Sequence, residues 1–235
     1  MSRARSAILL LALAASGAFA QAPEGRLYTP GSFDRVQIDG AGQVTLSQGD
    51  RDEVFVNGGA QMQAAVSVHV SGGRLQLSLP GAWKFWDSSG KAQVEVRMRQ
   101  VKNVSMSGAG DLVAAGPIRS PQLAVDVSGS GVARFDDLRA DKLSFTISGS
   151  GEGQLAGRVE RLQLSVSGKG KVTAGQLQAG DANVSISGVG NAEVWVTDGL
   201  NVDISGAGHV RYRGQPKIRQ SISGWGSVEA GIEAR

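Results

Sequence analysis

The sequence predicts an all-β fold: a parallel, right-handed β-helix with rungs of about 20 residues and an irregular N-terminal part that contains a β-hairpin. Three observations support this prediction. A Ser-Gly-x-Gly motif recurs at a nearly constant interval, apolar residues alternate with polar ones around each copy, and the 34 glycines occur without a sustained helical pattern after the first 20 residues. Each glycine inside a helix would cost about 1 kcal/mol, so a helical fold is a poor alternative.

The motif occurs seven times in the second half of the chain, each time after an apolar residue. Its first glycines are Gly108, Gly129, Gly149, Gly168, Gly188, Gly206 and Gly224. They are 21, 20, 19, 20, 18 and 18 residues apart, and a variant with aspartate in place of serine, Asp39-Gly40-Ala41-Gly42, occurs once earlier. A period near 20 residues is typical of a solenoid, in which each repeat buries its apolar face against its neighbours.

The residues on both sides of each motif have the period of a β-strand. In one repeat the apolar residues Leu143, Phe145 and Ile147 alternate with the polar residues Ser144 and Thr146, and the other repeats follow the same rule. Alternation at period two places the apolar side chains on one face of a strand. We therefore expect each repeat to form a strand, a glycine turn and a second strand, with equivalent strands paired in parallel around an apolar core.

The constant residues of the motif suit a structural turn. Glycine reaches backbone conformations with positive φ at little cost, and it leaves room where successive rungs bring their backbones close together. We expect the serine hydroxyls to form a ladder that bonds the backbone of the turn or of the neighbouring rung. The motif is thus predicted to be the corner of every rung.

Residues 31–105 are less regular than the repeats at 106–231. No motif occurs between Gly40 and Gly108, and two alternating runs at 66–70 and 75–79 flank Gly72-Gly73, which is a hairpin signal. We expect antiparallel pairing here and a strand near 93–101 that leads into the regular repeats. No composition typical of a linker divides the chain, so residues 21–235 are predicted to form one domain.

Residues 1–20 have the features of a secretory signal peptide. Arg3 and Arg5 precede an apolar run at 7–15, and Ala18-Phe19-Ala20 is a cleavage signature of the A-x-A type. The apolar run is too short to span a bilayer, which takes about 20 residues, and no later stretch is apolar enough to do so. We expect an exported protein in the periplasm, secreted or on the cell surface, without a transmembrane segment after cleavage.

Composition narrows the classes of partner. The chain has no cysteine, so the exported domain depends on its core rather than on disulfides. Loss of residues 1–20 removes two of the 24 basic residues, which leaves 22 against 21 acidic residues, a charge of +1. The basic residues are scattered along the chain, whereas a nucleic-acid-binding surface gathers them on one face. Nucleic acid is therefore not an expected partner.

Ligand-binding interpretations of the motif do not fit the residues that follow it. Phosphate loops need a helix directly after the glycines, and none is predicted. Calcium-binding repeats need an aspartate after each glycine pair, but that place holds Asp111, Val132, Glu152, Lys171, Asn191, His209 and Ser227. No serine lies in the G-x-S-x-G turn of a nucleophile. No cofactor site is expected in the repeats.

Few side chains elsewhere offer catalytic or metal chemistry. His69 and His209 are the only histidines, too few for a zinc site in a chain without cysteine. Asp126 and Asp203 occupy the same repeat position four strands apart, about 19 Å, whereas glycoside hydrolysis needs two carboxyls within about 9.5 Å. Asp136-Asp137 is expected to mark a corner. No metal site and no catalytic residue is predicted.

Aromatic residues give the best local sign of a contact surface. Trp83, Phe85 and Trp86 lie in the turn-rich stretch at 80–90, where exposed aromatic rings would stack on sugars or contact a protein partner. The alternative is that these rings fold back and cover an end or edge of the solenoid. Trp225 replaces a small residue in the last motif, and we expect it to cap the end of the stack, because solenoids need caps.

The sequence resembles a known bacterial family. The opening FDRVQIDG at 33–40 and VTLSQGD at 44–50, followed in order by the Ser-Gly-x-Gly repeats, is similar to the exported head GIN domains labelled auto-transporter adhesins. The resemblance covers nearly all of 31–231. It implies a β-helix outside the inner membrane, with no established enzymatic residues to carry over.

We therefore expect an exported, non-enzymatic β-solenoid that is adhesin-like or serves as a binding or scaffold protein of the cell envelope. Its partner would be an envelope component, a glycan or a protein. The alternative is a carbohydrate-active β-helix enzyme or a polysaccharide-binding module. Outward carboxylates clustered in a groove would favour the enzyme, and a flat face of Ser, Thr and Asn would favour binding. A third possibility is a structural protein whose solenoid ends stack.

Overall fold

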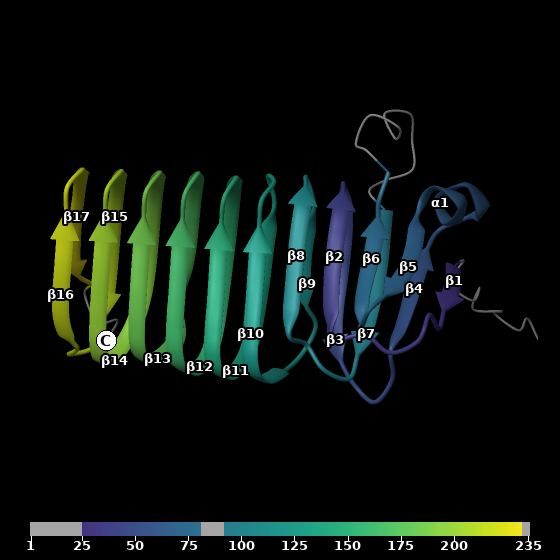
Figure 1. Cartoon of the computed structure of the whole chain (residues 1–235), viewed down its shortest axis with the longest axis horizontal. Helices are drawn as coiled ribbons and strands as arrows, with labels where there is room; N and C mark the ends of the chain where they lie inside the picture. The colour runs from purple at the N-terminus through teal and green to yellow at the C-terminus, as the bar shows by residue number, and fades with distance from the viewer. Residues whose placement is uncertain (1–24, 81–91, 232–235) are drawn as a thin grey trace, which may run out of the picture.

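The computed structural model describes residues 25–80 and 92–231, and Figure 1 shows their arrangement. The protein is nearly all-β, a β-solenoid of about six turns, as the repeats predict. The predicted signal peptide at 1–20 and the aromatic cluster of Trp83, Phe85 and Trp86 lie outside the described residues.

The regular half consists of long strands that run from one motif to the next. Each strand bends midway, so that its first part lies in one sheet face and its second part in the other. These strands are β10 (Ile118–Val127), β11 (Val132–Ile147), β12 (Ser150–Val166), β13 (Lys169–Ile186) and β14 (Val189–Ile204). The C-terminal end consists of the shorter strands β15 (Ala207–Arg213), β16 (Lys217–Ile222) and β17 (Trp225–Ala230). The strands β15 and β16 stack on the two parts of β14, and β17 stacks on β15. All neighbouring rungs in this half pair in parallel.

The pairing register stacks the predicted apolar residues into a continuous core. Leu143 pairs with Leu162, which pairs with Ala182, which pairs with Leu200. These four side chains are at most 1% exposed, and Phe145 is fully buried in the next inward row. Burying a large apolar side chain contributes about 1.5 to 3 kcal/mol, so the stacked rows are the main source of stability. The predicted alternation is confirmed.

Close approach explains the first glycine of each motif in the regular half. A Cβ added to Gly168, Gly188 or Gly206 would lie 1.9–2.1 Å from the carbonyl oxygen of the equivalent glycine one rung earlier. That oxygen also accepts a hydrogen bond from the variable residue of the next turn, as in Val189 N–H to Gly168 O at 2.9 Å. The parallel ladder therefore continues through the corners, and the rungs are too close there for a side chain.

The prediction of positive φ holds only at the start of the series. Gly40 and Gly108 have φ values of 108° and 117°, whereas the first glycines of the later motifs lie outside the left-handed region. Hydrogen bonding between rungs does not explain the difference, because Ala109 N–H donates to Gly40 O at 3.0 Å just as Val189 N–H donates to Gly168 O at 2.9 Å. The predicted serine ladder is present in part, since Ser128 and Ser167 donate their hydroxyls to Met106 O and Ile147 O at 3.2 and 3.5 Å.

In the N-terminal part the order of the rungs differs from the order of the chain. Three pairs of strands form three rungs here: β2 (Arg35–Gly40) with β3 (Gly42–Gln48), β6 (Arg74–Ser78) with β7 (Ala92–Met98), and β8 (Asn103–Gly108) with β9 (Asp111–Ala114). The strand β2 pairs in parallel with both β6 and β8, and β3 pairs with both β7 and β9. The first rung in sequence is therefore the middle rung of the three.

Antiparallel strands and a helix close the N-terminal end. They are β1 (Gly25–Tyr28), β4 (Glu53–Asn57), α1 (Ala60–Ala65) and β5 (Ser67–Ser71). The strand β5 pairs antiparallel with β6 through a turn at Gly72 and Gly73, both with positive φ, which confirms the predicted hairpin. The strand β4 pairs antiparallel with β1 and β7, and Met62 of α1 packs onto the core.

The C-terminal end is open among the described residues. Here β16 pairs only with β14, and β17 pairs only with β15. The prediction that Trp225 caps this end is wrong, because its side chain is 88% exposed. Trp225 occupies the variable position of the last turn, where side chains point away from the solenoid. Val189 occupies the same position two rungs earlier, and its side chain is 56% exposed.

Candidate functional site

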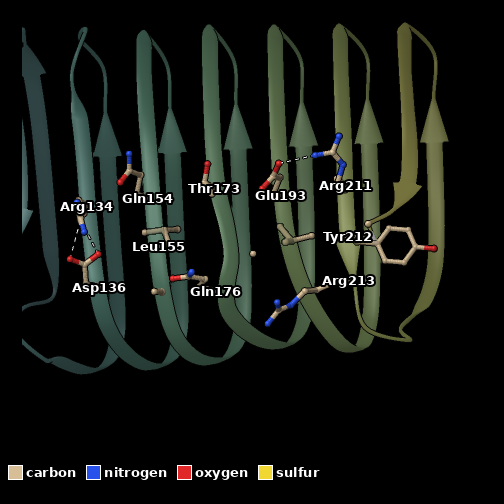
Figure 2. Close-up of a pocket in the computed structure, with 14 residues that line it drawn as sticks. Arg134, Asp136, Gln154, Leu155, Thr173, Gln176, Glu193, Arg211, Tyr212 and Arg213 are labelled. Atoms are coloured by element: carbon tan, nitrogen blue, oxygen red, sulfur yellow. Dashed lines mark hydrogen bonds and ion pairs between the residues drawn. The ribbon is translucent and has the colours of Figure 1, made fainter. Parts of the chain in front are cut away.

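A shallow groove crosses the outer face of the sheet formed by the first parts of β11 to β14 and by β15. Figure 2 shows its lining residues, and its volume is about 490 Å³. One row along the groove consists of side chains that follow the first motif glycine by five residues. The row comprises Arg134, Gln154, Thr173, Glu193 and Arg211.

The parallel register creates this row. Arg134 pairs with Gln154, Gln154 with Thr173, Thr173 with Glu193, and Glu193 with Arg211. Their neighbours along each strand are the buried core residues, so the row itself points to solvent. Successive members are about 4.8 Å apart, the spacing of neighbouring strands.

Irregular pairing and small residues form the hollow beside the row. The register shifts between Phe135 and Leu138 and again between Gln154 and Ala156. Ala156 and Gly175 line the hollow, and a Cβ at Gly175 would meet only Glu193 Oε2 at 4.0 Å. The surface is therefore hollowed at this point, because small residues stand where bulky side chains would otherwise fill the space.

Ion pairs fix the two ends of the groove. Arg134 Nε donates to both carboxylate oxygens of Asp136 at 2.9 Å, and this hydrogen bond raises the pKa of Arg134. At the other end Arg211 Nη1 donates to Glu193 Oε1 at 3.0 Å, and Figure 2 shows both pairs. These exposed pairs contribute little to stability, about 0 to 1 kcal/mol each, but they orient polar groups toward the groove.

A second row, of planar side chains, crosses the rungs farther along the strands than the groove row. In register, one per rung, it comprises Arg119, Arg139, Arg158, Gln178, Trp195 and Arg213. Arg213 lies over the Trp195 ring with its guanidinium carbon 4.0 Å from the centroid. Indole and guanidinium planes are surfaces on which sugar rings and other flat groups stack.

The opposite sheet presents a flat polar face. Its outward row in register consists of hydroxyl groups and two carboxylates, Ser105, Asp126, Thr146, Ser165, Ser185 and Asp203. In the adjacent row Asn201 Nδ2 donates to Asn183 Oδ1 at 2.8 Å.

Charged residues gather at the base of the N-terminal rungs. Lys102 Nζ donates to Asp34 Oδ2 at 2.7 Å, and this hydrogen bond lowers the pKa of the Asp34 carboxyl. Arg99 binds Asp52 Oδ2 at 2.7 Å and donates to Ser32 Oγ at 2.7 Å. All five residues lie in the irregular half, so these contacts hold its loops to one another.

The carboxylates singled out in the sequence are not brought together. Asp126 and Asp203 lie in one row separated by Thr146, Ser165 and Ser185, as predicted. Asp136-Asp137 lies at the register shift of β11, in agreement with the predicted corner.

The two histidines are also far apart in the fold. His69 lies on β5 and His209 on β15, where His209 Nδ1 is 2.9 Å from Ser227 Oγ. Within residues 25–80 and 92–231, no group of three or more His, Cys, Asp or Glu side chains could hold a metal ion.

The groove row was not predicted from the sequence, although the sequence contains a signal for it. A constant offset of five residues after each first glycine identifies Arg134, Gln154, Thr173, Glu193 and Arg211. The hollow beside the row has no such signal, because it depends on register shifts that no repeat pattern encodes.

The fold and the groove define a class, the β-solenoids with a row of outward polar side chains repeated along one sheet. Within that class, the chain belongs to the family described as "Putative auto-transporter adhesin, head GIN domain", whose model matches residues 32–216. The resemblance found in the sequence is confirmed. Among curated proteins, no match to the chain is found.

Solved structures share the fold at low sequence identity. A "putative adhesin" of Bacteroides fragilis is 22% identical with a TM-score of 0.81, over 90% of this chain and 98% of that one. A "putative adhesin" of Parabacteroides merdae is 21% identical with a TM-score of 0.70, over 91% and 98%. A "putative lipid binding protein" of Parabacteroides distasonis is 22% identical with a TM-score of 0.70, over 91% and 98%.

Proposed function

We propose that the protein is an exported, adhesin-like binding protein that holds an extended glycan in the groove along β11 to β15. The observation that carries this proposal is the row of outward polar side chains repeated once per rung, from Arg134 to Arg211. A ligand that repeats along its own length can make equivalent contacts at successive rungs. An extended polysaccharide has that property.

The chemistry of the lining favours a glycan. Gln154, Thr173 and Glu193 offer donors and acceptors to hydroxyl groups, and Arg213 adds a guanidinium plane to the groove lining. The Trp195 ring supports this plane from below, with the guanidinium carbon 4.0 Å from the ring centroid. Open polar grooves of this kind bind through many modest contacts and bridging waters rather than through one deep pocket. Affinity would then grow with the number of sugar units that the groove holds.

The spacing of the groove carboxylates argues against the enzymatic alternative. Asp136 and Glu193 lie on β11 and β14, three rungs or about 14 Å apart, beyond the range of about 5 to 9.5 Å that glycoside hydrolysis uses. Each of them also accepts a hydrogen bond from an arginine. We therefore propose binding without catalysis, and no residue in the groove is assigned a catalytic role.

Export agrees with this proposal. Membership of an adhesin family points to an exported or surface protein, and residues 1–20 have the pattern of a signal peptide. In the part of the chain that the structure describes, no helix has the length and apolar character to cross a membrane.

A glycan array tests the proposal with three forms of the protein. The groove variant Gln154→Ala/Arg211→Ala removes two exposed members of the row, and the matched control Gln163→Ala/Ser185→Ala removes two exposed side chains of the opposite face. We expect wild type and control to bind the same glycans and the groove variant to lose most of the signal. Absence of any bound glycan, or equal binding by all three forms, would contradict the proposal.

The aromatic cluster of Trp83, Phe85 and Trp86 is proposed as a second contact surface. The double variant Trp83→Ala/Trp86→Ala belongs in the same array. If it alone loses binding, the contact surface lies in the 81–91 segment and not in the groove.

A further inference from the structure

The open C-terminal rung contrasts with the rung on which it stacks. Leu200 and Ile204 of β14 are at most 1% exposed because Ile218 and Ile222 of β16 cover them in register. Ile218 and Ile222 occupy the same inward positions but are 38% and 39% exposed. One further layer of strands would bury them as fully as the residues beneath.

Both strands of this rung also have an unpaired edge among the described residues. The strands β16 and β17 run in opposite directions on the two faces of the solenoid (Figure 1). An unprotected strand edge is a template for pairing with another chain. The opposite end of the solenoid differs, because antiparallel strands and α1 cover it.

Symmetry narrows the ways in which a second copy could cover this end. A two-fold axis through the end of the stack pairs edges in antiparallel fashion, as isologous dimers do. A two-fold axis perpendicular to the sheets would pair β16 with β16 of the second copy. A two-fold axis parallel to the strands would pair β16 with β17 of the second copy.

Charge selects between these two arrangements. The strand β16 carries Lys217 and Arg219 without an acidic residue, whereas β17 carries Glu229 without a basic one. Pairing β16 with β16 would bring like charges together, which is destabilising, and pairing β16 with β17 brings opposite charges together.

We propose that the protein forms a tail-to-tail dimer in which β16 of each copy pairs antiparallel with β17 of the other. Ile218, Ile222 and Val228 of both copies would pack in the interface, and Gln220 between the isoleucines would place an amide that can donate and accept across it. One rung is a small contact area, so the dimer is weak and concentration-dependent. This proposal does not depend on what the groove binds.

Dimerisation would affect a multivalent ligand. The axis places the two grooves on opposite faces of the dimer, so that a polymer network that surrounds the dimer can engage both. Joining two sites in one particle raises the apparent affinity without any new contact to the ligand. A weak dimer would therefore bind a three-dimensional glycan network more strongly than isolated glycans.

A charge-swap series measured by analytical ultracentrifugation tests the dimer. Wild type is expected to shift from monomer to dimer as concentration rises. Arg219→Glu or Glu229→Arg alone should weaken the dimer about tenfold, and the double variant Arg219→Glu/Glu229→Arg should restore it to within about threefold of wild type. Ile222→Lys should abolish it, whereas the control Val189→Lys, at an exposed turn away from the end, should leave it unchanged.

Several outcomes would overturn the proposal. Wild type that stays monomeric up to its limit of solubility would mean that Lys217 and Arg219 protect the edge instead of pairing it. A dimer that the charge swap does not restore would rule out the β16–β17 arrangement. Higher oligomers in place of a dimer would point to head-to-tail growth. Thermal unfolding of each variant separates loss of pairing from loss of folding.

Discussion

The two halves of the solenoid use the same corner in different ways. In the regular half, rung follows rung in chain order, and the first glycine of each motif is required because the backbone of the preceding rung leaves no room for a Cβ. In the N-terminal half the chain doubles back, so that β2 and β3 lie between rungs that come later in the sequence. The repeated half provides a periodic surface, and the irregular half provides a covered end.

The two halves also differ in the interactions that stabilise them. The regular half depends on stacked apolar rows, and the irregular half adds antiparallel strands, a short helix and surface ion pairs. Proteins open most easily where few apolar contacts are buried. The comparison therefore predicts unequal responses to substitution in the two halves.

The largest loss is expected from truncation of the regular core. Phe145 is fully buried, and Phe145→Ala should lower the free energy of unfolding by about 4 kcal/mol. The matched change Met62→Ala in α1 removes a side chain at the edge of the core and should cost about half as much or less. Chemical denaturation measures both, and equal losses would show that the two halves do not differ in this way.

The second loss tests why the motif needs glycine. In Gly188→Ala the new Cβ would lie 2.1 Å from Gly168 O, and the rungs must separate locally, at a cost of about 3 kcal/mol. The control Gly175→Ala places a Cβ in open space in the neighbouring strand, with no left-handed φ, and should be nearly neutral. If Gly188→Ala unfolds at the same denaturant concentration as the control, close approach is not the reason for the glycine.

Engineered disulfides test the order of the rungs, because the chain has no cysteine of its own. Gln37 and Ser105 pair on neighbouring strands about 4.8 Å apart, so Gln37→Cys/Ser105→Cys should oxidise readily and stabilise the protein by about 2 kcal/mol. Gln76 and Ser105 lie two strands apart, about 9.6 Å, beyond disulfide reach. Non-reducing electrophoresis shows which of the two variants forms a disulfide. A disulfide in the Gln76→Cys/Ser105→Cys variant would contradict the position of β2 between β6 and β8.

The smallest effect concerns the ion pair between Asp34 and Lys102. Because Lys102 lowers the pKa of Asp34 below its ordinary value of 3.8, the pair stabilises the fold above that value, and the effect is lost as pH falls through the lowered pKa. Lys102→Met should therefore cost about 0.5 kcal/mol at neutral pH and progressively less below pH 3.8.

The control for this pH dependence is Lys169→Met, at a turn where its pairing partners are Ser150 and Val189. Denaturation of both variants across this pH range measures the difference. A pH-independent deficit in Lys102→Met would mean that the pair with Asp34 does not cause it.

Much of the regular half could be predicted from the sequence. The alternation of Leu143, Phe145 and Ile147 with polar residues determines which face is inward, and the motif spacing determines the register. The inserted position of β2 could not be predicted, because it depends on long-range pairing that the local pattern of residues 31–105 does not express.

The end of the stack and the groove could be predicted only in part. A tryptophan in the last motif suggested a cap, but the corner directs Trp225 to solvent. The row from Arg134 to Arg211 follows from the repeat offset, whereas the hollow beside it depends on register shifts and on small residues such as Ala156. Periodic features could be predicted from the repeat, and departures from it required the structure.

Titration of the best glycan from the array tests the central claim, that the regular half carries the binding surface. Calorimetry would compare wild type with Gln154→Ala/Arg211→Ala and with Trp83→Ala/Trp86→Ala. The groove variant should bind at least about tenfold more weakly, a loss of about 1.4 kcal/mol, and the aromatic variant should retain more of the affinity. Undiminished affinity in the groove variant, with binding lost in the aromatic variant, would move the binding surface to the irregular half and contradict the account.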